Sequence, residues 1–212
     1  MRKLLLLALL ALCLPIIACG NNEGSRKTAV ASDNAKGEAH NSTAASAAEK
    51  TSPKAKILVI YYSRSGNTAE LARQIRQKVG GDMLELKTVK QYPANYNDTT
   101  KQAKEELQSG FRPELQPIAV NLAAYDTIYL GSPCWWGGIA PPVITFLTER
   151  DLAGKTIIPF STHGGTGLGN TVTDVKKFAP AATVLDGLAV RGSDVKNAQN
   201  EITQWLTKLG KI

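Results

Sequence analysis

The chain has 212 residues, of which 43% are apolar, so it is long enough to bury a sizeable core in one ordinary domain. Lysine and arginine number 25 against 18 aspartate and glutamate residues, a net charge of +7, but no dense basic stripe runs along the sequence. This pattern disfavours a nucleic-acid-binding protein and is compatible with a small anion or an anionic surface as partner.

The first segment of the chain has the pattern of an export signal. Arg2 and Lys3 precede an apolar stretch over residues 4–17, which ends just before Cys19. This ending resembles the lipobox of bacterial lipoproteins, in which the cysteine thiol receives a diacylglycerol and becomes the new N-terminus. The resemblance implies that residues 1–19 are a lipoprotein signal peptide with Cys19 as the lipidation site. An ordinary secretory signal with an incidental cysteine is the alternative.

The segment after the signal changes composition. Residues 20–53 are dominated by Ala, Ser, Asn, Gly, Lys and Glu, and cannot bury enough apolar surface to offset the entropy lost on ordering. We therefore predict a disordered tether over 20–53 and a single domain over 54–212. Because Gly20 rather than aspartate follows the cysteine, we expect an exported, lipid-anchored protein on the periplasmic side of the outer membrane, where the host has two membranes. Cys134 is then the one thiol of the domain, which leaves no internal disulfide.

Five apolar runs alternate with helical patterns in the rest of the chain. Strands are predicted at 56–62, 83–86, 127–131, 156–160 and 182–189, and helices at 68–79, 99–107, 141–147, 172–178 and 194–209. Asp194 is predicted to cap the last helix. This alternation predicts an α/β fold, a doubly wound parallel sheet with helices on both faces.

Three polar, glycine-containing turns follow the first, third and fourth predicted strands, at residues 63–68, 131–138 and 161–165. In an open α/β sheet such turns meet at the carboxyl edge, where ligands bind. The first turn combines short hydroxyl side chains with backbone N–H groups at a helix start, which favours a bound phosphate over an unoccupied capped turn. It lacks the lysine of a Walker loop and the glycine spacing of a dinucleotide fingerprint.

The second turn offers flat aromatic surface, and the third offers a histidine. Trp135 and Trp136 would expose much apolar area in a surface loop unless a flat ligand covers them or they pack into the core. His163 is a candidate for stabilising negative charge on a reduced flavin, with a structural turn residue as the alternative. Cys134 is favoured as a packing residue over a redox thiol. The turns together describe a site for a phosphorylated, planar, hydrogen-bonding molecule, which FMN fits best.

The same turns resemble the loops of the flavodoxin-like family. Residues 61–68 are similar to the flavodoxin phosphate loop, and residues 131–137, with Pro141 and Pro142 after them, to the flavin-contacting loop; residues 162–167 are similar to the third loop. The resemblance covers roughly residues 55–209 and implies a five-stranded sheet in the order 2-1-3-4-5 that holds FMN non-covalently. The predicted cofactor-binding residues are Ser63, Arg64, Ser65, Gly66, Asn67, Thr68, Ser132, Pro133, Cys134, Trp135, Trp136, Gly137, Thr162, His163, Gly164 and Gly165. No metal site is expected.

These features favour a membrane-tethered, exported FMN flavoprotein that transfers electrons, with an unidentified redox protein or small molecule as partner and no nucleic acid. An NAD(P)H-dependent quinone or flavin reductase is one alternative, and a non-catalytic binder of a phosphorylated aromatic ligand is another. Residues 53–212 carry 19 basic and 14 acidic side chains, a net charge of +5, whereas electron-carrier flavodoxins tend to be acidic. Tyr92 and Tyr96, in the predicted loop over 90–100, can either cover the ring or pack locally.

Overall fold

The structure is a computed structural model and describes residues 56–212. The predicted signal peptide over 1–19, its Cys19 and the predicted tether over 20–53 lie outside the described residues. Among the helices of the described part, none combines the length and the apolar character needed to cross a bilayer.

Strands and helices alternate along the described chain. The strands are β1 (Ile57–Tyr62), β2 (Asp82–Leu86), β3 (Thr127–Trp135), β4 (Gly138–Ile139), β5 (Thr156–His163), β6 (Thr183–Val184) and β7 (Leu188–Arg191). The helices are α1 (Asn67–Val79), α2 (Tyr96–Ser109), α3 (Pro141–Glu149), α4 (Thr171–Phe178) and α5 (Gln199–Lys208), with short 3-10 turns at Leu122–Ala124 and Val195–Asn197.

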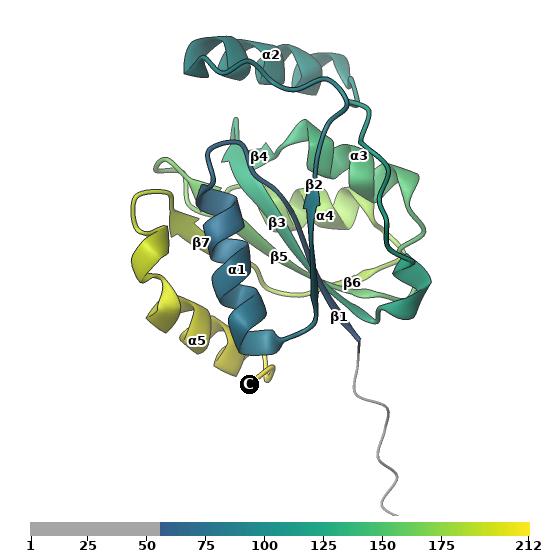
Figure 1. Ribbon diagram of the computed structural model, residues 1–212, viewed down its shortest axis with the longest axis vertical. Coiled ribbons are helices and arrows are strands. Elements are labelled where there is room, and N and C mark those ends of the chain that lie inside the picture. The colour runs from purple at the N-terminus through teal and green to yellow at the C-terminus, as the bar shows by residue number, and fades with distance from the viewer. Residues whose placement is uncertain (1–55) are drawn as a thin grey trace, which may run out of the picture. The chain divides into compact units, whose positions relative to one another are not determined.

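The main sheet is parallel and has the order β2-β1-β3-β5-β6, with β7 also paired to β5 (Figure 1). Because β6 and β7 both lie beside β5, they form the two halves of a fifth strand, and the predicted order 2-1-3-4-5 is confirmed. The prediction of one continuous strand over 182–189 is wrong in one respect. Its pairing with β5 stops after Val184 and resumes at Leu188. Pro159, in β5 beside this gap, has no N–H to donate to a ladder.

Both faces of the sheet are covered, which explains why its strands read as unbroken apolar runs. In β1, Leu58 and Ile60 point into one core cluster with α3 and α4, whereas Val59 points into a second cluster with α1 and α5. All three side chains are fully buried. Alternation along a strand thus fills two cores at once, as parallel sheets require.

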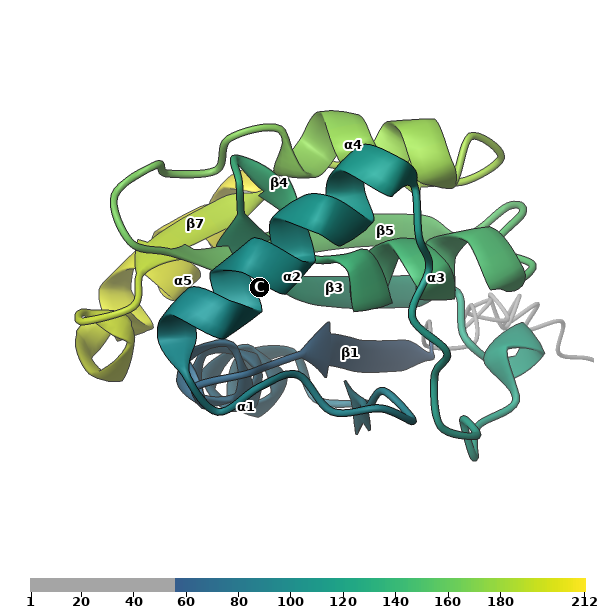
Figure 2. The ribbon, with the colours of Figure 1, turned by 90° about the horizontal axis from the view of Figure 1, so that it is seen from above.

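Helix α2 lies on neither face of the sheet. It sits beyond the carboxyl ends of the strands in Figure 1 and crosses over them in Figure 2. Its N-terminus is capped by the Asn95 side chain, which accepts hydrogen bonds from the N–H groups of Asn97 (2.8 Å) and Asp98 (3.2 Å). The cap starts the helix at Tyr96, three residues before the predicted start, and so places the first turn of α2 at the carboxyl edge.

The predicted cap at Asp194 is wrong. The Asp194 side chain makes no capping bond and instead accepts a hydrogen bond from the Ser193 hydroxyl at 2.8 Å. Asn197 N–H donates to the Asp194 carbonyl, which closes a 3-10 turn, and α5 begins only at Gln199. A tight turn thus separates β7 from the last helix.

Candidate functional site

The loop after β1 is held by two of its hydroxyl side chains. The Ser63 hydroxyl accepts a hydrogen bond from Ala69 N–H at 3.2 Å, and the buried Thr68 hydroxyl bonds to the Thr162 hydroxyl, 94 residues further on, at 2.8 Å. Gly66 has φ of 89°, a backbone conformation that favours glycine. Ser63 and Thr68 therefore shape the loop and tie it to β5, which leaves Ser65 and Asn67 to face a ligand.

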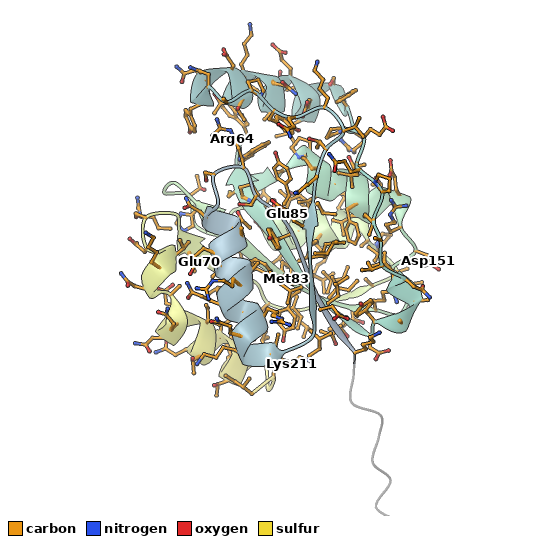
Figure 3. The ribbon with its side chains drawn as sticks, viewed as in Figure 1. Arg64, Glu70, Met83, Glu85, Asp151 and Lys211 are labelled. Carbon is orange, nitrogen blue, oxygen red and sulfur yellow. The ribbon has the colours of Figure 1, made fainter. Side chains whose placement is uncertain are left out.

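Arg64 connects this loop to α2. Its guanidinium donates to the Thr99 hydroxyl at 3.0 Å and to the Ala94 carbonyl at 2.6 Å. Figure 3 shows Arg64 beneath α2, at the gap between that helix and the sheet. The sequence placed Arg64 among the cofactor-binding residues, and the structure places it on the cavity wall, bonded to Thr99 of α2 and to Ala94 just before that helix.

The loop after β3 is a tight hairpin. Trp135 pairs with Gly138 and Cys134 with Ile139, so that β3 runs further than predicted and turns back as β4. The turn residues Trp136 and Gly137 have φ of 52° and 83°. Such a turn needs positive φ at both central positions, and a tryptophan there is strained.

Neighbouring segments fix the hairpin. Gly137 carbonyl accepts from Asn170 N–H at 2.7 Å, and Ile139 N–H donates to the Asp174 carboxylate at 3.1 Å. Burial raises the pKa of Asp174, and the Ile139 N–H opposes that rise. The Ser132 hydroxyl accepts from Ala140 N–H at 2.9 Å and is buried. Ser132, predicted to bind the cofactor, uses its hydroxyl in this bond and does not line the cavity described below.

The two adjacent tryptophans have different surroundings. Trp135 packs edge-on against Tyr92 and Tyr62, with ring centres 5.1 and 5.7 Å apart. Trp136 is 58% exposed; its indole N–H donates to the Thr100 carbonyl at 3.0 Å, and the Lys104 ammonium lies 4.9 Å from its ring centre. Trp135 is thus part of the core and of the site wall, and Trp136 links the hairpin to α2.

Tyr92 and Tyr96 are also separated. The Tyr92 hydroxyl donates a hydrogen bond to the buried Glu106 carboxylate. Burial of Tyr92, together with this bond, raises the pKa of Tyr92. Tyr96 is 69% exposed and faces the cavity described below. Of the two tyrosines, Tyr92 packs locally and Tyr96 remains available to a ligand.

The loops enclose a cavity with two adjoining lobes at the carboxyl edge. The smaller lobe, of about 450 Å³, is lined by Ser65, Asn67, Tyr96, Pro133, Cys134, Trp135, Thr162, His163, Gly164, Arg191, Gly192 and Ser193. The larger lobe, of about 950 Å³, is lined by Arg64, Ser65, Tyr96, Thr99, Thr100, Ala103, Pro133, Cys134, Trp135, Trp136, Gly137, Gly164, Gly165 and Thr166. Both volumes are typical of small-molecule sites.

Most of the residues predicted from the three turns meet at this cavity. Four do not line it, namely Ser63, Gly66, Thr68 and Ser132. The sequence reasoning considered Tyr96 as a cover of the ring, but it missed Thr99, Thr100 and Ala103 of α2 and residues 191–193. The end of the fifth strand could have indicated residues 191–193, because every carboxyl end of a parallel sheet reaches the same edge.

Two residues that line the smaller lobe, His163 and Cys134, carry polar side-chain atoms. The His163 Nδ1 atom is buried and has no hydrogen-bond partner in the described part of the chain. Cys134 is half-buried, and its sulfur accepts from the Thr166 hydroxyl at 3.3 Å. Within residues 56–212, no group of three or more His, Cys, Asp and Glu side chains is arranged to hold a metal ion. The donor set suits an organic ligand with polar and anionic groups.

A doubly wound sheet with this cavity at its carboxyl edge defines the class of α/β proteins that bind a small molecule at that edge. The chain belongs to the flavodoxin family, because the sequence model of that family, described as Flavodoxin, matches residues 56–209.

Two solved structures illustrate the relationship. A protein of Bacteroides uniformis, assigned as a flavoprotein, is 34% identical, with a TM-score of 0.63, and the match covers 72% of this chain and 98% of that one. A flavoprotein of Lactobacillus acidophilus, solved in complex with FMN, is 30% identical, with a TM-score of 0.56, and the match covers 68% of this chain and 97% of that one.

Proposed function

We propose that this protein is an exported flavoprotein that holds FMN non-covalently at the carboxyl edge, transfers electrons, and is tethered to a membrane through a lipid on Cys19. One observation carries the cofactor assignment: three loops far apart in sequence line one two-lobed cavity. The family membership and the FMN complex of the Lactobacillus acidophilus relative support the same ligand.

The residues of the cavity fit FMN. Ser65, Asn67 and the start of α1 supply neutral donors for the phosphate, and Arg191 supplies a positive charge in the same lobe. Trp135, Trp136 and Tyr96 give the larger lobe the aromatic walls that an isoalloxazine ring needs. When bound, FMN supplies reversible one- and two-electron chemistry.

The protein's own groups position the flavin and limit its contact with water. The hairpin is fixed by the bonds from Asn170 and to Asp174, so its backbone amides are held in place before the ring arrives. Helix α2, held by Arg64 and Trp136, forms one wall of the larger lobe. His163 lines the smaller lobe, to which we assign the phosphate, and not the larger lobe, to which we assign the ring.

Electron transfer to and from partners is the favoured form of this chemistry. Nicotinamide donors are found in the cytoplasm, so the predicted export disfavours the reductase alternative. Steady-state assays with NADH, NADPH and quinones separate the two: turnover supports a reductase, and a reversible dithionite bleach without turnover supports a carrier. A ligand that dithionite leaves unchanged would instead support the non-catalytic binder.

The binding test uses the protein purified from residue 20 onward. Titration with FMN is expected to shift the flavin absorbance and to saturate at one FMN per chain. Ser65→Glu places a carboxylate beside the phosphate and is expected to weaken binding several-fold or more. Thr207→Glu, an exposed change on α5, is the matched control and should bind as the parent does. Equal affinity of the Ser65→Glu chain and the parent would show that the phosphate lies elsewhere.

The membrane tether is tested with the full chain. Cys19→Ala removes the thiol that is predicted to receive the diacylglycerol, so the variant is expected to lose metabolic labelling with palmitate and to leave the membrane fraction. Cys13→Ala is the matched control, because that cysteine lies within the predicted signal peptide. Retention of both the label and the membrane location in the Cys19→Ala chain would rule out the anchor.

A further inference from the structure

The end of β7 brings a fourth segment to the cavity, outside the three turns that the sequence singled out. Arg191 is the last residue of β7 and pairs with His163 across the sheet. Its guanidinium donates to the Gly164 carbonyl at 3.0 Å and lines the smaller lobe with Ser65 and Asn67. A cation from the last strand therefore shares a lobe with the loop that follows the first strand.

The backbone around Arg191 is held on both sides. Gly192 N–H donates to the His163 carbonyl at 2.9 Å, and Asp194 N–H donates to the Arg191 carbonyl at 2.8 Å. A Cβ on Gly192 would lie 2.6 Å from the Asn67 side-chain nitrogen, so this segment packs directly on the loop after β1. The backbone of Arg191 is thus fixed relative to that loop, and its exposed side chain extends from this position.

The charge of Arg191 is uncompensated within residues 56–212. The three ion pairs of the described part involve Arg73, Lys87 and Lys208. Apart from the bond to Gly164, no protein acceptor of the described chain takes a hydrogen bond from Arg191. Arg64 also borders the cavity, but its guanidinium is bonded to the start of α2. Arg191 is therefore the arginine with free N–H groups beside Ser65 and Asn67.

We propose that Arg191 pairs with the phosphate of the bound flavin and makes the site select FMN over riboflavin. This inference rests on the proposed function. A guanidinium forms charge-assisted, often bidentate hydrogen bonds to phosphate oxygens, whereas Ser65 and Asn67 offer neutral donors. Riboflavin has a hydroxyl where FMN has the phosphate, so Arg191 adds little to its binding.

The test compares the affinity of the protein for FMN and for riboflavin, measured by flavin fluorescence at two salt concentrations. Arg191→Gln removes the charge and is expected to weaken FMN binding about tenfold, with riboflavin affinity nearly unchanged. Arg191→Lys keeps the charge but not the planar fork, and is expected to fall between the parent and Arg191→Gln. The parent is expected to lose FMN affinity with added salt more steeply than Arg191→Gln.

Lys211→Gln is the matched control, since it makes the same change of charge on an exposed residue that lies far from α2 and Arg64 in Figure 3. It should leave both affinities unchanged. If Arg191→Gln weakened the affinities for FMN and for riboflavin equally, the proposal would be overturned, because Arg191 would then only position the Gly164 loop. Unchanged FMN binding would overturn it too. A parent protein that binds neither flavin would instead refute the proposed function.

Discussion

At the scale of single residues, Trp135 and Trp136 show how adjacent side chains acquire different roles. Trp135 still belongs to β3, so its side chain follows the pleat and packs on Tyr62 and Tyr92. Trp136 lies in the hairpin turn with positive φ, which directs it away from the core towards α2. Both rings nevertheless line the larger lobe.

The buried Glu106 carboxylate is stabilised by hydrogen bonds from the Tyr92 and Gln102 side chains. Tyr92→Phe removes the hydroxyl that donates to Glu106 and leaves a buried carboxylate with Gln102 as its side-chain donor. We expect a loss of about 1–3 kcal/mol in the free energy of unfolding, because a buried polar group loses a hydrogen bond. Urea unfolding at neutral pH measures this change.

Tyr96→Phe is the control for this prediction. The Tyr96 ring is 69% exposed, so removal of its hydroxyl should change stability by less than about 0.5 kcal/mol. Equal effects of the two substitutions would mean that the bond between Tyr92 and Glu106 contributes no stability.

At the scale of elements, the hairpin and α2 together build the larger lobe. Helix α4 fixes the hairpin, because its Asp174 carboxylate accepts a hydrogen bond from Ile139 N–H. Helix α2 is fixed near its N-terminus twice, by the bond from Arg64 to Thr99 and by the bond from the Trp136 indole to Thr100. The two elements are therefore coupled through Trp136, and loosening one is expected to loosen the other.

Two substitutions at Asp174 test the support from α4. Asp174→Ala leaves Ile139 N–H without its acceptor and should lower the free energy of unfolding by about 1–3 kcal/mol. Asp174→Asn keeps an acceptor oxygen and removes a charge whose burial is unfavourable, so it should be neutral or stabilising at pH 7. Thermal or urea unfolding of both variants gives the comparison, and a larger loss in Asp174→Asn than in Asp174→Ala would contradict this account.

At the scale of the whole molecule, the sheet buries several tyrosines, which makes stability sensitive to alkaline pH. Burial raises the pKa of Tyr129 to about 12 from its ordinary value of 10.0, and burial raises the pKa of Tyr62 as well. Below pH 10 these groups are protonated in both states and contribute no pH dependence. Above pH 10 the unfolded chain loses protons that the folded chain keeps, so stability falls as the pH rises towards 12.

Urea midpoints measured between pH 8 and 11 check this sign, with pH values chosen around the ordinary tyrosine pKa of about 10. The midpoint is expected to decline above pH 10, and Tyr129→Phe is expected to reduce the decline. A midpoint that rises in this range, or an unchanged decline in the variant, would show that burial of these tyrosines does not set the alkaline limit.

The net charge of +5 on residues 53–212 also acts at this scale. Positive potential around a flavin favours the added electron, so we expect a less negative reduction potential than that of an acidic flavodoxin. Redox titration of the FMN-loaded protein measures it, and a final reduction step as low as in an acidic flavodoxin would refute the expectation.

The sequence by itself determined the strands, the turns and most of the cavity, whereas the strand order was implied by the resemblance to the flavodoxin-like family. Buried parallel strands must be apolar on both faces, and turns at their carboxyl ends must converge, so the apolar runs and the polar turns at 63–68, 131–138 and 161–165 were sufficient evidence. Each apolar run and each polar turn can be recognised from a short stretch of sequence. The turns then meet because the strands of a parallel sheet all end at the same edge.

Only the tertiary structure decided the rest. The position of α2 over the carboxyl edge follows from contacts such as those of Arg64 with the Ala94 carbonyl and of Trp136 with the Thr100 carbonyl, which join residues about 30 apart or more. The placement of Arg191 follows from its pairing with His163 at the end of the interrupted fifth strand. No local periodicity encodes such contacts, because each depends on where two distant segments meet.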